Sequence, residues 1–232
     1  MGGNSNTHHD PVERALKASA ARYIGVHPRF RWYAFLKYRM DPCYRAIGQR
    51  VGKDSFTVDL GTGLGMLPVL LGELGEHRRV LGIEWDPERM RCGQHAARGI
   101  PGVEMVKGDL HTTPIPACDV ITLIDVLHYY EADRQEALLR RCRAALSPGG
   151  RLLLREGDGG RPGGAHWTRI VEKWATRLGW NHGPVVRFRP ISELRATLVK
   201  LGFHVDEDEV ASRFLPGNVL LVAEVEETSQ PQ

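Results

Sequence analysis

Residues 58–68 read VDLGTGLGMLP, and this stretch decides the expected fold. A short apolar strand carries Asp59 near its end, glycines then alternate at positions 61, 63 and 65, and an apolar helix begins at Met66. Glycine tolerates positive φ and lets a ligand approach the backbone closely, as a ligand lying across a strand–helix turn requires. The usual dinucleotide spacing is G-x-G-x-x-G, and an acid ahead of the first glycine disfavours a pyrophosphate. The stretch therefore predicts a ligand that is cationic at this end, with a plain glycine turn as the alternative.

Strand and helix patterns alternate on both sides of this turn. Short apolar runs predict strands at residues 56–60, 80–84, 103–107, 120–125, 151–156, 203–209 and 218–225. Amphipathic or capped segments predict helices at residues 11–22, 30–39, 42–52, 66–74, 87–98, 133–146, 167–178 and 192–201. Apolar strands separated by helices indicate a parallel sheet that is covered on both faces. The last two strands have no helix between them, which indicates an antiparallel hairpin at the sheet edge.

Composition excludes several classes of protein. The chain has 232 residues, 42% of them hydrophobic and 25% charged, which is typical of a globular domain and not of a disordered or collagen-like chain. The net charge is only +3, so no nucleic-acid partner is expected. The charge is uneven, because residues 1–53 carry ten Lys and Arg against three acids, whereas residues 202–232 carry one Arg against seven acids.

Targeting and metal signals are weak in this sequence. No apolar run reaches the roughly 20 residues of a membrane span, and the first ten residues are polar. The four cysteines, at positions 43, 92, 118 and 142, are scattered, which disfavours both a disulfide framework and a thiolate metal site. We therefore expect a cytoplasmic protein with reduced cysteines and no metal.

Acidic residues also follow the ends of the second and third predicted strands. Glu84 lies 19 residues after the last glycine of the turn, where a carboxylate can accept two hydrogen bonds from a ribose diol. Trp85 beside it has a ring that can cover an adenine. Asp109 can accept a hydrogen bond from an exocyclic amine while Leu110 packs on the base. Acids at three successive strand ends predict an anionic rim that binds an adenosyl compound.

Several segments together resemble the class I S-adenosylmethionine-dependent methyltransferases, strongly over residues 55–156 and weakly as far as residue 225. The glycine turn is similar to the first motif of that family, residues 118–129 to its fourth motif, and residues 146–152 to the entry into its fifth strand. The resemblance implies an α/β doubly wound, mostly parallel seven-stranded sheet of order 3-2-1-4-5-7-6 with strand 7 antiparallel. It implies S-adenosyl-L-methionine as the cofactor. The implied cofactor-binding residues are Asp59, Gly61, Thr62, Gly63, Gly65, Glu84, Trp85, Asp109, Leu110 and Asp125.

One histidine and its neighbours are the candidates for the chemistry. A sulfonium methyl group is already electrophilic, so a methyltransferase mainly aligns the acceptor atom with it and excludes water. His128, three residues beyond Asp125, is the expected general base for an oxygen acceptor, with a structural histidine as the alternative. Tyr129 and Trp167 are expected beside the acceptor. The family's members that act on nucleobase or glutamine nitrogens often carry an Asn-Pro-Pro-Tyr-like segment here, and its absence favours a small molecule or an oxygen or carbon acceptor.

The segment at residues 29–39, RFRWYAFLKYR, is rich in aromatic and basic side chains. As a helix it places Trp32, Leu36 and Met40 on one face at i, i+4 spacing. This helix is expected to cap the site by packing on the sheet domain. The alternative is a docking surface for an acyl carrier protein or a membrane.

Residues within the same segment are also expected at the site. Tyr38 and Arg39 are predicted to contact the substrate or the cofactor carboxylate. Residues 35–42 faintly resemble methyltransferases of bacterial aryl-polyene and polyketide clusters, which implies an aromatic or acyl acceptor.

The expected organisation is a helical cap at residues 1–53, a Rossmann-like methyltransferase domain at 54–227 and a tail at 228–232. The expected function is methyl transfer from S-adenosylmethionine to an oxygen or carbon of an aromatic, polyketide or lipid-like small molecule, free or carrier-bound. One alternative is a non-catalytic module that binds an adenosyl compound. A NAD-dependent oxidoreductase is a second alternative, which Asp59 and the glycine spacing disfavour.

Overall fold

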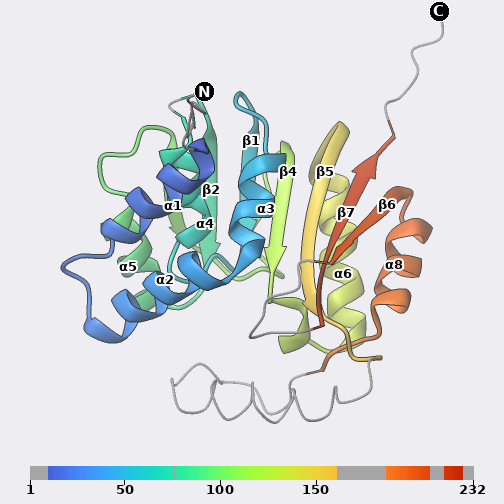
Figure 1. The fold of residues 1–232 in the computed structure, drawn as a ribbon. Coiled ribbons are helices and arrows are strands. Elements are labelled where there is room, and N and C mark those ends of the chain that lie inside the picture. The colour runs from blue at the N-terminus through green and yellow to red at the C-terminus, as the bar shows by residue number, and fades with distance from the viewer. Residues whose placement is uncertain (1–9, 76, 161–186, 210–216, 227–232) are drawn as a thin grey trace, which may run out of the picture.

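A single sheet runs through the computed structural model, which describes residues 10–75, 77–160, 187–209 and 217–226 (Figure 1). The seven strands follow the order β3-β2-β1-β4-β5-β7-β6. They are β1 (Phe56–Leu60), β2 (Arg79–Glu84), β3 (Val103–Lys107), β4 (Cys118–Ile124), β5 (Leu146–Gly157), β6 (Phe203–Glu209) and β7 (Asn218–Val225). Strand β7 is antiparallel to β5 and β6, and the other neighbours pair in parallel. The predicted fold class, strand order and edge hairpin are confirmed.

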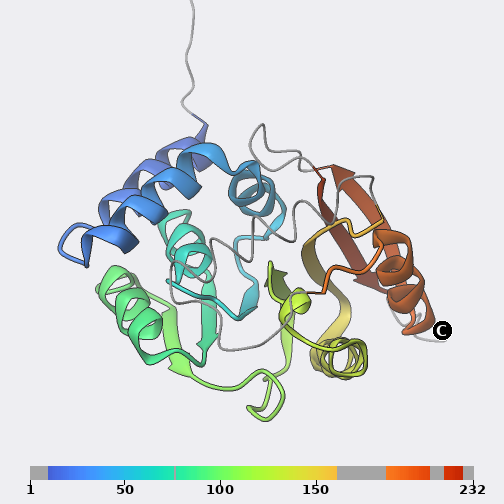
Figure 2. The same ribbon diagram turned by 90° about the horizontal axis from the view of Figure 1, so that it is seen from below.

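Helices cover both faces of the sheet, as the view along the strands shows (Figure 2). One face carries α1 (Pro11–Ala21), α2 (Pro28–Met40), α3 (Pro42–Arg50), α4 (Met66–Glu73) and α5 (Pro87–Ala96). The other carries α6 (Ala132–Ala145) and α8 (Ile191–Lys200). Each face has its own cluster of buried apolar side chains, and the cluster of the first face includes residues of α1, α2 and α3 together with α4 and α5. The N-terminal helices therefore share a core with the sheet domain.

Three of these helices begin at an aspartate followed by proline. The carboxylates of Asp10, Asp41 and Asp86 each accept a hydrogen bond from the backbone N–H two residues later, at the first turns of α1, α3 and α5. Proline at the first helical position has no N–H to leave unpaired, and its fixed φ suits a helix. The helix starts predicted at residues 11, 42 and 87 are confirmed.

Strand β5 begins five residues before the run predicted at residues 151–156. Strand β5 already pairs with β4 at Leu146, opposite Cys118, and pairs again from Arg151, opposite Val120. The extra residues form a bulge in which Gly149 takes a φ of 71°. A bulge lets a strand resume its register after a local turn. The predicted strand is therefore present, and the structure adds a short pairing ahead of it.

The apolar face predicted for α2 points outward. Trp32 is 64% exposed and Leu36 is 46% exposed, whereas Phe30, Ala34 and Tyr38 are buried. The Tyr38 hydroxyl donates a hydrogen bond to the Met66 carbonyl, 2.6 Å away. The core side of α2 is thus the one that carries Tyr38, because a buried phenol needs an acceptor and α4 supplies one.

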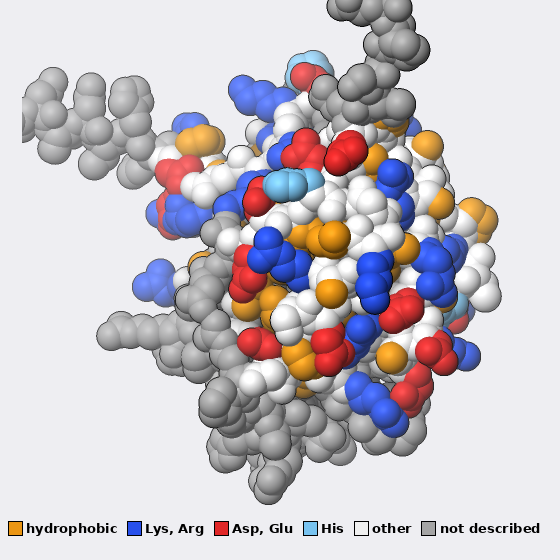
Figure 3. Space-filling view, turned by 90° about the vertical axis from the view of Figure 1, so that its right-hand side faces the viewer, with side chains coloured by type: hydrophobic (Ala, Val, Ile, Leu, Met, Phe, Trp, Pro, Cys, Tyr) orange, Lys and Arg blue, Asp and Glu red, His pale blue; other side chains and the backbone are white. Residues whose placement is uncertain are grey.

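The edge formed by β6 and α8 has a mixed surface. Acidic, basic and hydrophobic side chains are interspersed on this side of the molecule (Figure 3). No helix within the described ranges is both long enough and apolar enough to cross a bilayer.

Candidate functional site

The glycine turn joins β1 to α4 at the carboxyl edge of the sheet. Gly61, Gly63 and Gly65 have φ values of 70°, 58° and 73°, which side chains with a Cβ rarely adopt. A Cβ on Gly61 would lie 2.8 Å from a Val126 methyl group, so that glycine is needed for packing. A Cβ on Gly63 would meet nothing within 4 Å. The turn therefore leaves open space at Gly63, as a ligand lying against its backbone requires.

Glu84 ends β2 with its carboxylate turned toward this space. The side chain is buried, and Oε2 accepts a hydrogen bond from the Gly63 N–H at 2.7 Å. Oε1 accepts another from the Asp86 N–H at 2.9 Å. A carboxylate has about four acceptor sites, so two such bonds leave sites for a ribose diol. Glu84 also connects the glycine turn to β2, and the predicted ribose contact fits this geometry.

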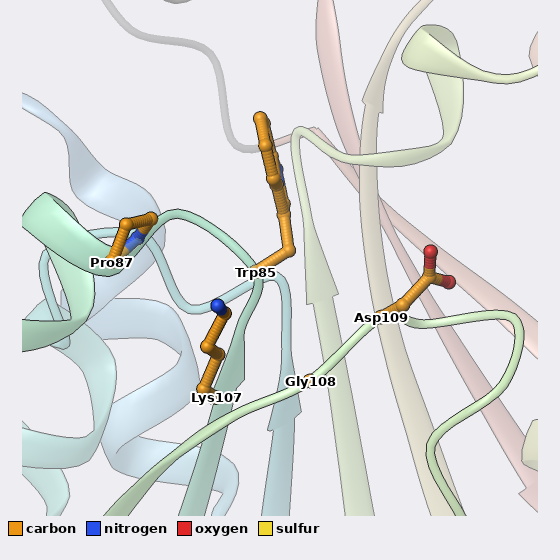
Figure 4. A pocket seen from close by; sticks show the side chains of 5 residues that line it. All are labelled: Trp85, Pro87, Lys107, Gly108 and Asp109. Atoms are coloured by element: carbon orange, nitrogen blue, oxygen red, sulfur yellow. The ribbon is translucent and has the colours of Figure 1, made fainter.

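A pocket of about 450 Å³ opens beyond the ends of β2 and β3. It is lined by Trp85, Pro87, Lys107, Gly108 and Asp109 (Figure 4). The Trp85 indole stands up from the end of β2, with Asp109 on one side and Pro87 on the other (Figure 4). The exposed Trp85 indole can stack on a base, and the Asp109 carboxylate can accept a hydrogen bond from the exocyclic amine of that base. The pocket thus unites the two residues predicted to hold an adenine.

Leu110, the next residue in the chain after Asp109, is buried and does not line the pocket. The Asp109 carboxylate accepts a hydrogen bond from the His111 N–H at 2.7 Å. This bond fixes the orientation of Asp109.

Asp59 lies beneath the glycine turn rather than in the open space. Its side chain is buried and accepts a hydrogen bond from the Thr122 hydroxyl at 2.6 Å. Burial raises the pKa of Asp59 to about 6, although the hydrogen bond from Thr122 opposes this rise. A cationic ligand above the turn favours the ionised carboxylate. The contact of Asp59 and Thr62 with the cofactor stays a prediction.

Asp125 follows β4 and belongs to a buried network of four charges, formed by Lys37, Asp41, Asp125 and Arg155. Arg155, whose side chain is 1% exposed, donates hydrogen bonds to both oxygens of Asp41 at 2.7 and 2.6 Å. It also donates from Nε to Asp125 at 2.9 Å and pairs with that carboxylate through a second nitrogen. The Lys37 ammonium lies 3.0 Å from Asp41 and 3.4 Å from Asp125. Two cations and two anions thus balance.

This network shapes both the backbone and the ionisation of Asp125. Its φ of 57° makes Asp125 the one non-glycine residue with positive φ among the described residues. Burial favours the neutral acid, but Arg155 and Lys37 hold the pKa of Asp125 well below its usual range. The Asp125 side chain is still 34% exposed. The network therefore presents an ionised carboxylate at the carboxyl edge of the sheet.

His128 lies in the 3-10 helix η1 (Leu127–Tyr129) and is paired with Glu156 of β5. Its Nδ1 is 2.7 Å from Glu156 Oε2, and both side chains are buried. The other oxygen of Glu156 accepts hydrogen bonds from the backbone N–H groups of Val126 and Leu127, at 3.0 and 2.7 Å. Glu156 thus fixes both the ring of His128 and the backbone that carries it.

The surroundings of His128 are aromatic. The centroid of its ring lies 4.3 Å from that of Tyr129 and 4.7 Å from that of Phe188. Burial opposes the charged form, but the Glu156 carboxylate raises the pKa of His128 above its usual value. Tyr129 is 39% exposed, so the aromatic wall beside His128 reaches solvent at this residue.

The remaining predicted contacts are dispersed. Tyr38 is buried in the core, where its hydroxyl is bonded to α4, and Arg39 is exposed on α2. Trp167, with the helix predicted at residues 167–178, lies outside the described residues. These substrate contacts remain untested predictions, and packing accounts for Tyr38.

The fold brings four further residues to this edge that were not predicted from the sequence: Lys37, Asp41, Arg155 and Glu156. One signal was available for two of them, because an Arg-Glu pair directly after the apolar run 152–154 is unusual at the end of a buried strand. Lys37 and Asp41 had no such signal, since only the packing of α2 and α3 brings them to β5.

Cysteine and metal chemistry are not prominent in the part of the chain that the structure describes. Its four cysteines are free and buried. No three metal-ligating side chains gather within those residues.

Comparison with known proteins agrees with this geometry. Residues 58–154 match the model of a family described as a methyltransferase domain. The match runs from β1 into β5 and covers the glycine turn, Glu84, Asp109 and Asp125. Over residues 58–154 the chain therefore matches a methyltransferase domain, which agrees with the resemblance to class I S-adenosylmethionine-dependent methyltransferases. The predicted family and its cofactor are confirmed.

Individual relatives match over the same domain. The chain is 39% identical over 103 residues to acetylserotonin O-methyltransferase of Mus musculus, which covers 44% of this chain and 26% of that protein. It is 33% identical over 100 residues to the tetracenomycin polyketide synthesis 8-O-methyl transferase TcmO of Streptomyces glaucescens, covering 42% of this chain and 29% of that protein. The chain thus spans less than a third of the length of these two relatives.

A solved structure has the same fold. The mitomycin 7-O-methyltransferase MmcR superposes with a TM-score of 0.64 at 21% identity, over 94% of this chain and 59% of that chain. At this level of identity the likeness concerns the fold.

Proposed function

We propose that this protein transfers the methyl group of S-adenosylmethionine to an oxygen of an aromatic or polyketide-like small molecule. The names of two relatives, which refer to acetylserotonin and to a polyketide, support an aromatic oxygen acceptor. The bound sulfonium supplies an electrophilic methyl group. The chain supplies cofactor binding, a wall for the acceptor and a group that accepts the acceptor's proton.

The cofactor-binding part of the proposal uses the open space along the glycine turn. Glu84 holds the ribose, Trp85 and Asp109 hold the adenine in the pocket beyond β2, and the backbone at Gly63 lies against the ligand. The fit rests on the vacant volume at Gly63 and on the remaining acceptor sites of Glu84.

The observation that carries the oxygen acceptor is the pair of His128 and Glu156. Since Nδ1 donates to the carboxylate, Nε2 is the atom left to accept a proton. A phenol or hydroxyl loses its proton as it attacks a methyl group, and a positioned histidine accelerates such steps by roughly 10²- to 10⁴-fold. Tyr129 provides an aromatic wall beside this base.

The test of the proposed function measures binding and turnover in the same preparation. We expect calorimetric binding of S-adenosylmethionine and of S-adenosylhomocysteine, and formation of the latter when phenolic or polyketide acceptors are added. The Glu84→Ala variant is expected to lose much of its cofactor affinity, because the ribose hydrogen bonds are removed. Unchanged affinity in that variant contradicts the ribose assignment.

The same measurements separate the alternatives. A non-catalytic adenosyl-binding module binds both compounds yet forms no product with any acceptor. A NAD-dependent oxidoreductase gives a calorimetric response to NADH, for which the site offers no pyrophosphate-binding G-x-G-x-x-G turn.

The outer face of α2 is proposed to meet an anionic lipid surface, in line with a lipid-like acceptor. Trp32, Phe35 and Leu36 are all more than 40% exposed, and Arg39 is exposed on the same helix. Exposed aromatic and basic side chains together suit the interface between headgroups and acyl chains. An acidic carrier protein would complement the basic side chains of α2. The exposed aromatic rings of Trp32 and Phe35 favour a lipid surface instead, because such rings insert between headgroups and acyl chains.

A further inference from the structure

The charge network contains one pair of opposite charges that is partly exposed at the carboxyl edge of the sheet. Lys37 and Asp125 lie 3.4 Å apart, and their side chains are 16% and 34% exposed. Their partners within the network, Asp41 and Arg155, are only 4% and 1% exposed. The network is thus layered, with a buried pair that anchors and a more exposed pair that can meet a ligand.

The position of this pair is set by the glycine turn. Asp125 directly precedes Val126, whose methyl group packs within 2.8 Å of where a Cβ on Gly61 would lie. Strand β4, which Asp125 follows, pairs with β1, with Thr122 opposite Asp59. Asp125, and Lys37 paired with it, therefore lie near Gly61 of the turn and are not among the residues that line the pocket of Trp85.

Helix periodicity explains why Lys37, and not a neighbour, reaches this place. Consecutive helical residues are about 100° apart, so Lys37, Tyr38 and Arg39 point in three directions. The structure buries Tyr38 against α4 and exposes Arg39 to solvent. Only Lys37 of these three lies within ion-pair distance of Asp125.

We propose that Lys37 and Asp125 form a clamp for the amino-acid end of the cofactor, with Lys37 binding its carboxylate and Asp125 its ammonium group. This inference rests on the proposed function. S-adenosylmethionine ends in a zwitterion, so its carboxylate and ammonium group are opposite in charge to Lys37 and Asp125 respectively.

The buried layer makes such a clamp stable. Arg155 binds Asp125 through two nitrogens, and Asp41 lies 3.0 Å from the Lys37 ammonium, so each exposed group is held from below by an opposite charge. An ammonium group has three donors, and the two carboxylates use two of them. Burial alone would lower the pKa of Lys37, but Tyr33, Asp125 and Asp41 raise it above its usual value. The Lys37 ammonium group therefore stays protonated.

The test compares three adenosyl ligands that differ only at the amino-acid end. S-adenosylmethionine has both charges, its decarboxylated analogue keeps the ammonium group, and 5′-methylthioadenosine has neither. For Lys37→Met we expect the Kd of S-adenosylmethionine to rise roughly 10- to 100-fold by calorimetry, the value of a charge-assisted hydrogen bond. The Kd values of the other two ligands are expected to stay within about twofold.

Two controls accompany this measurement. Lys37→Arg retains the charge and is expected to recover most of the affinity for S-adenosylmethionine. Arg31→Met removes an exposed charge from the same helix and is expected to leave all three Kd values unchanged. Unchanged binding of 5′-methylthioadenosine by Lys37→Met shows that the adenosyl site is still folded.

Two outcomes overturn the clamp. One is wild-type affinity of Lys37→Met for S-adenosylmethionine. The other is an equal loss for all three ligands, which shows that Lys37 only supports the fold. Both leave the proposed function intact as long as the wild-type protein binds S-adenosylmethionine, whereas a wild-type protein that ignores all three ligands contradicts the proposed function itself.

Discussion

Several single side chains at the carboxyl edge serve the fold and the site together. The Asp41 carboxylate caps α3 by accepting a hydrogen bond from the Cys43 N–H, and it also accepts two hydrogen bonds from Arg155. Glu156 accepts hydrogen bonds from two backbone N–H groups as well as from His128. Carboxylates suit this use because each oxygen has more than one acceptor site. Changing such a residue affects structure and chemistry together, so conservative variants give the clearest tests.

The pairing of His128 with Glu156 predicts a shifted pH profile. Because Glu156 raises the pKa of His128, the base is protonated at low pH, and kcat/KM is expected to rise as the pH increases through this pKa. In Glu156→Gln the attracting charge is gone, so the rise is expected at lower pH. His128→Ala is expected to lose roughly 10²-fold or more in kcat with little change in cofactor Kd.

A profile that keeps its position in Glu156→Gln contradicts the positioning role of the glutamate. Wild-type kcat in His128→Ala shows that the histidine only packs. Calorimetry with S-adenosylhomocysteine serves as the control for folding in both variants.

At the scale of elements, the glycine turn separates packing from ligand binding. Gly61 and Gly63 both have positive φ, so alanine strains the backbone at either position by about 1–3 kcal/mol. Only at Gly61 does the added methyl group also meet a side chain, at Val126. We therefore expect Gly61→Ala to lower the free energy of unfolding by more than Gly63→Ala does, as measured by urea denaturation.

For cofactor affinity, the effect of Gly63→Ala is expected to be the larger of the two. Gly63→Ala places a methyl group in the open space where the ligand is proposed to lie, so its loss of S-adenosylhomocysteine affinity is expected to exceed its loss of stability. Normal affinity in Gly63→Ala would place the cofactor elsewhere.

Helix α2 carries a separate prediction, for its outer face. Full-length protein is expected to co-sediment with vesicles of phosphatidylcholine and phosphatidylglycerol, and less so with phosphatidylcholine alone, because basic side chains accompany the exposed aromatic ones. The double variant Trp32→Ser, Phe35→Ser is expected to lose this binding. Val199→Ser serves as the control, since Val199 is a 55% exposed apolar residue on α8. Absence of vesicle binding by the wild-type protein excludes the lipid surface and leaves the acidic carrier protein.

For the whole molecule, Asp59 predicts a loss of stability as the pH rises. Its pKa is about 6 in the folded protein against an ordinary value of 3.8, because burial penalises the charge. The folded state therefore holds the proton more tightly, so the contribution is fully present below pH 4 and is lost as the pH rises through 6. The difference amounts to about 3 kcal/mol.

The measurement compares the free energies of unfolding of the wild-type protein and Asp59→Asn, without ligand, at pH 4 and pH 7. The asparagine keeps an acceptor for Thr122 but cannot ionise, so the variant is expected to gain stability relative to the wild type between these pH values. A constant difference contradicts the raised pKa.

The sequence by itself determined the strands and helices of the sheet domain, and the family resemblance implied the strand order, which the structure confirms. Apolar strand runs, Asp-Pro helix starts and the glycine turn are local signals, and the ends of parallel strands fall at one edge in any sheet of this order. The nearby acids Glu84 and Asp109 could therefore be found by their place in the chain.

Only the tertiary structure decided which distant charges meet. Lys37 and Asp125 are 88 residues apart, and Asp41 and Arg155 are 114 apart, so no local pattern connects them. The orientation of α2 was likewise undecided, since its sequence has aromatic side chains on more than one face and the packing against α4 selects which are buried. Long-range packing sets such contacts because burial depends on the surfaces of other elements.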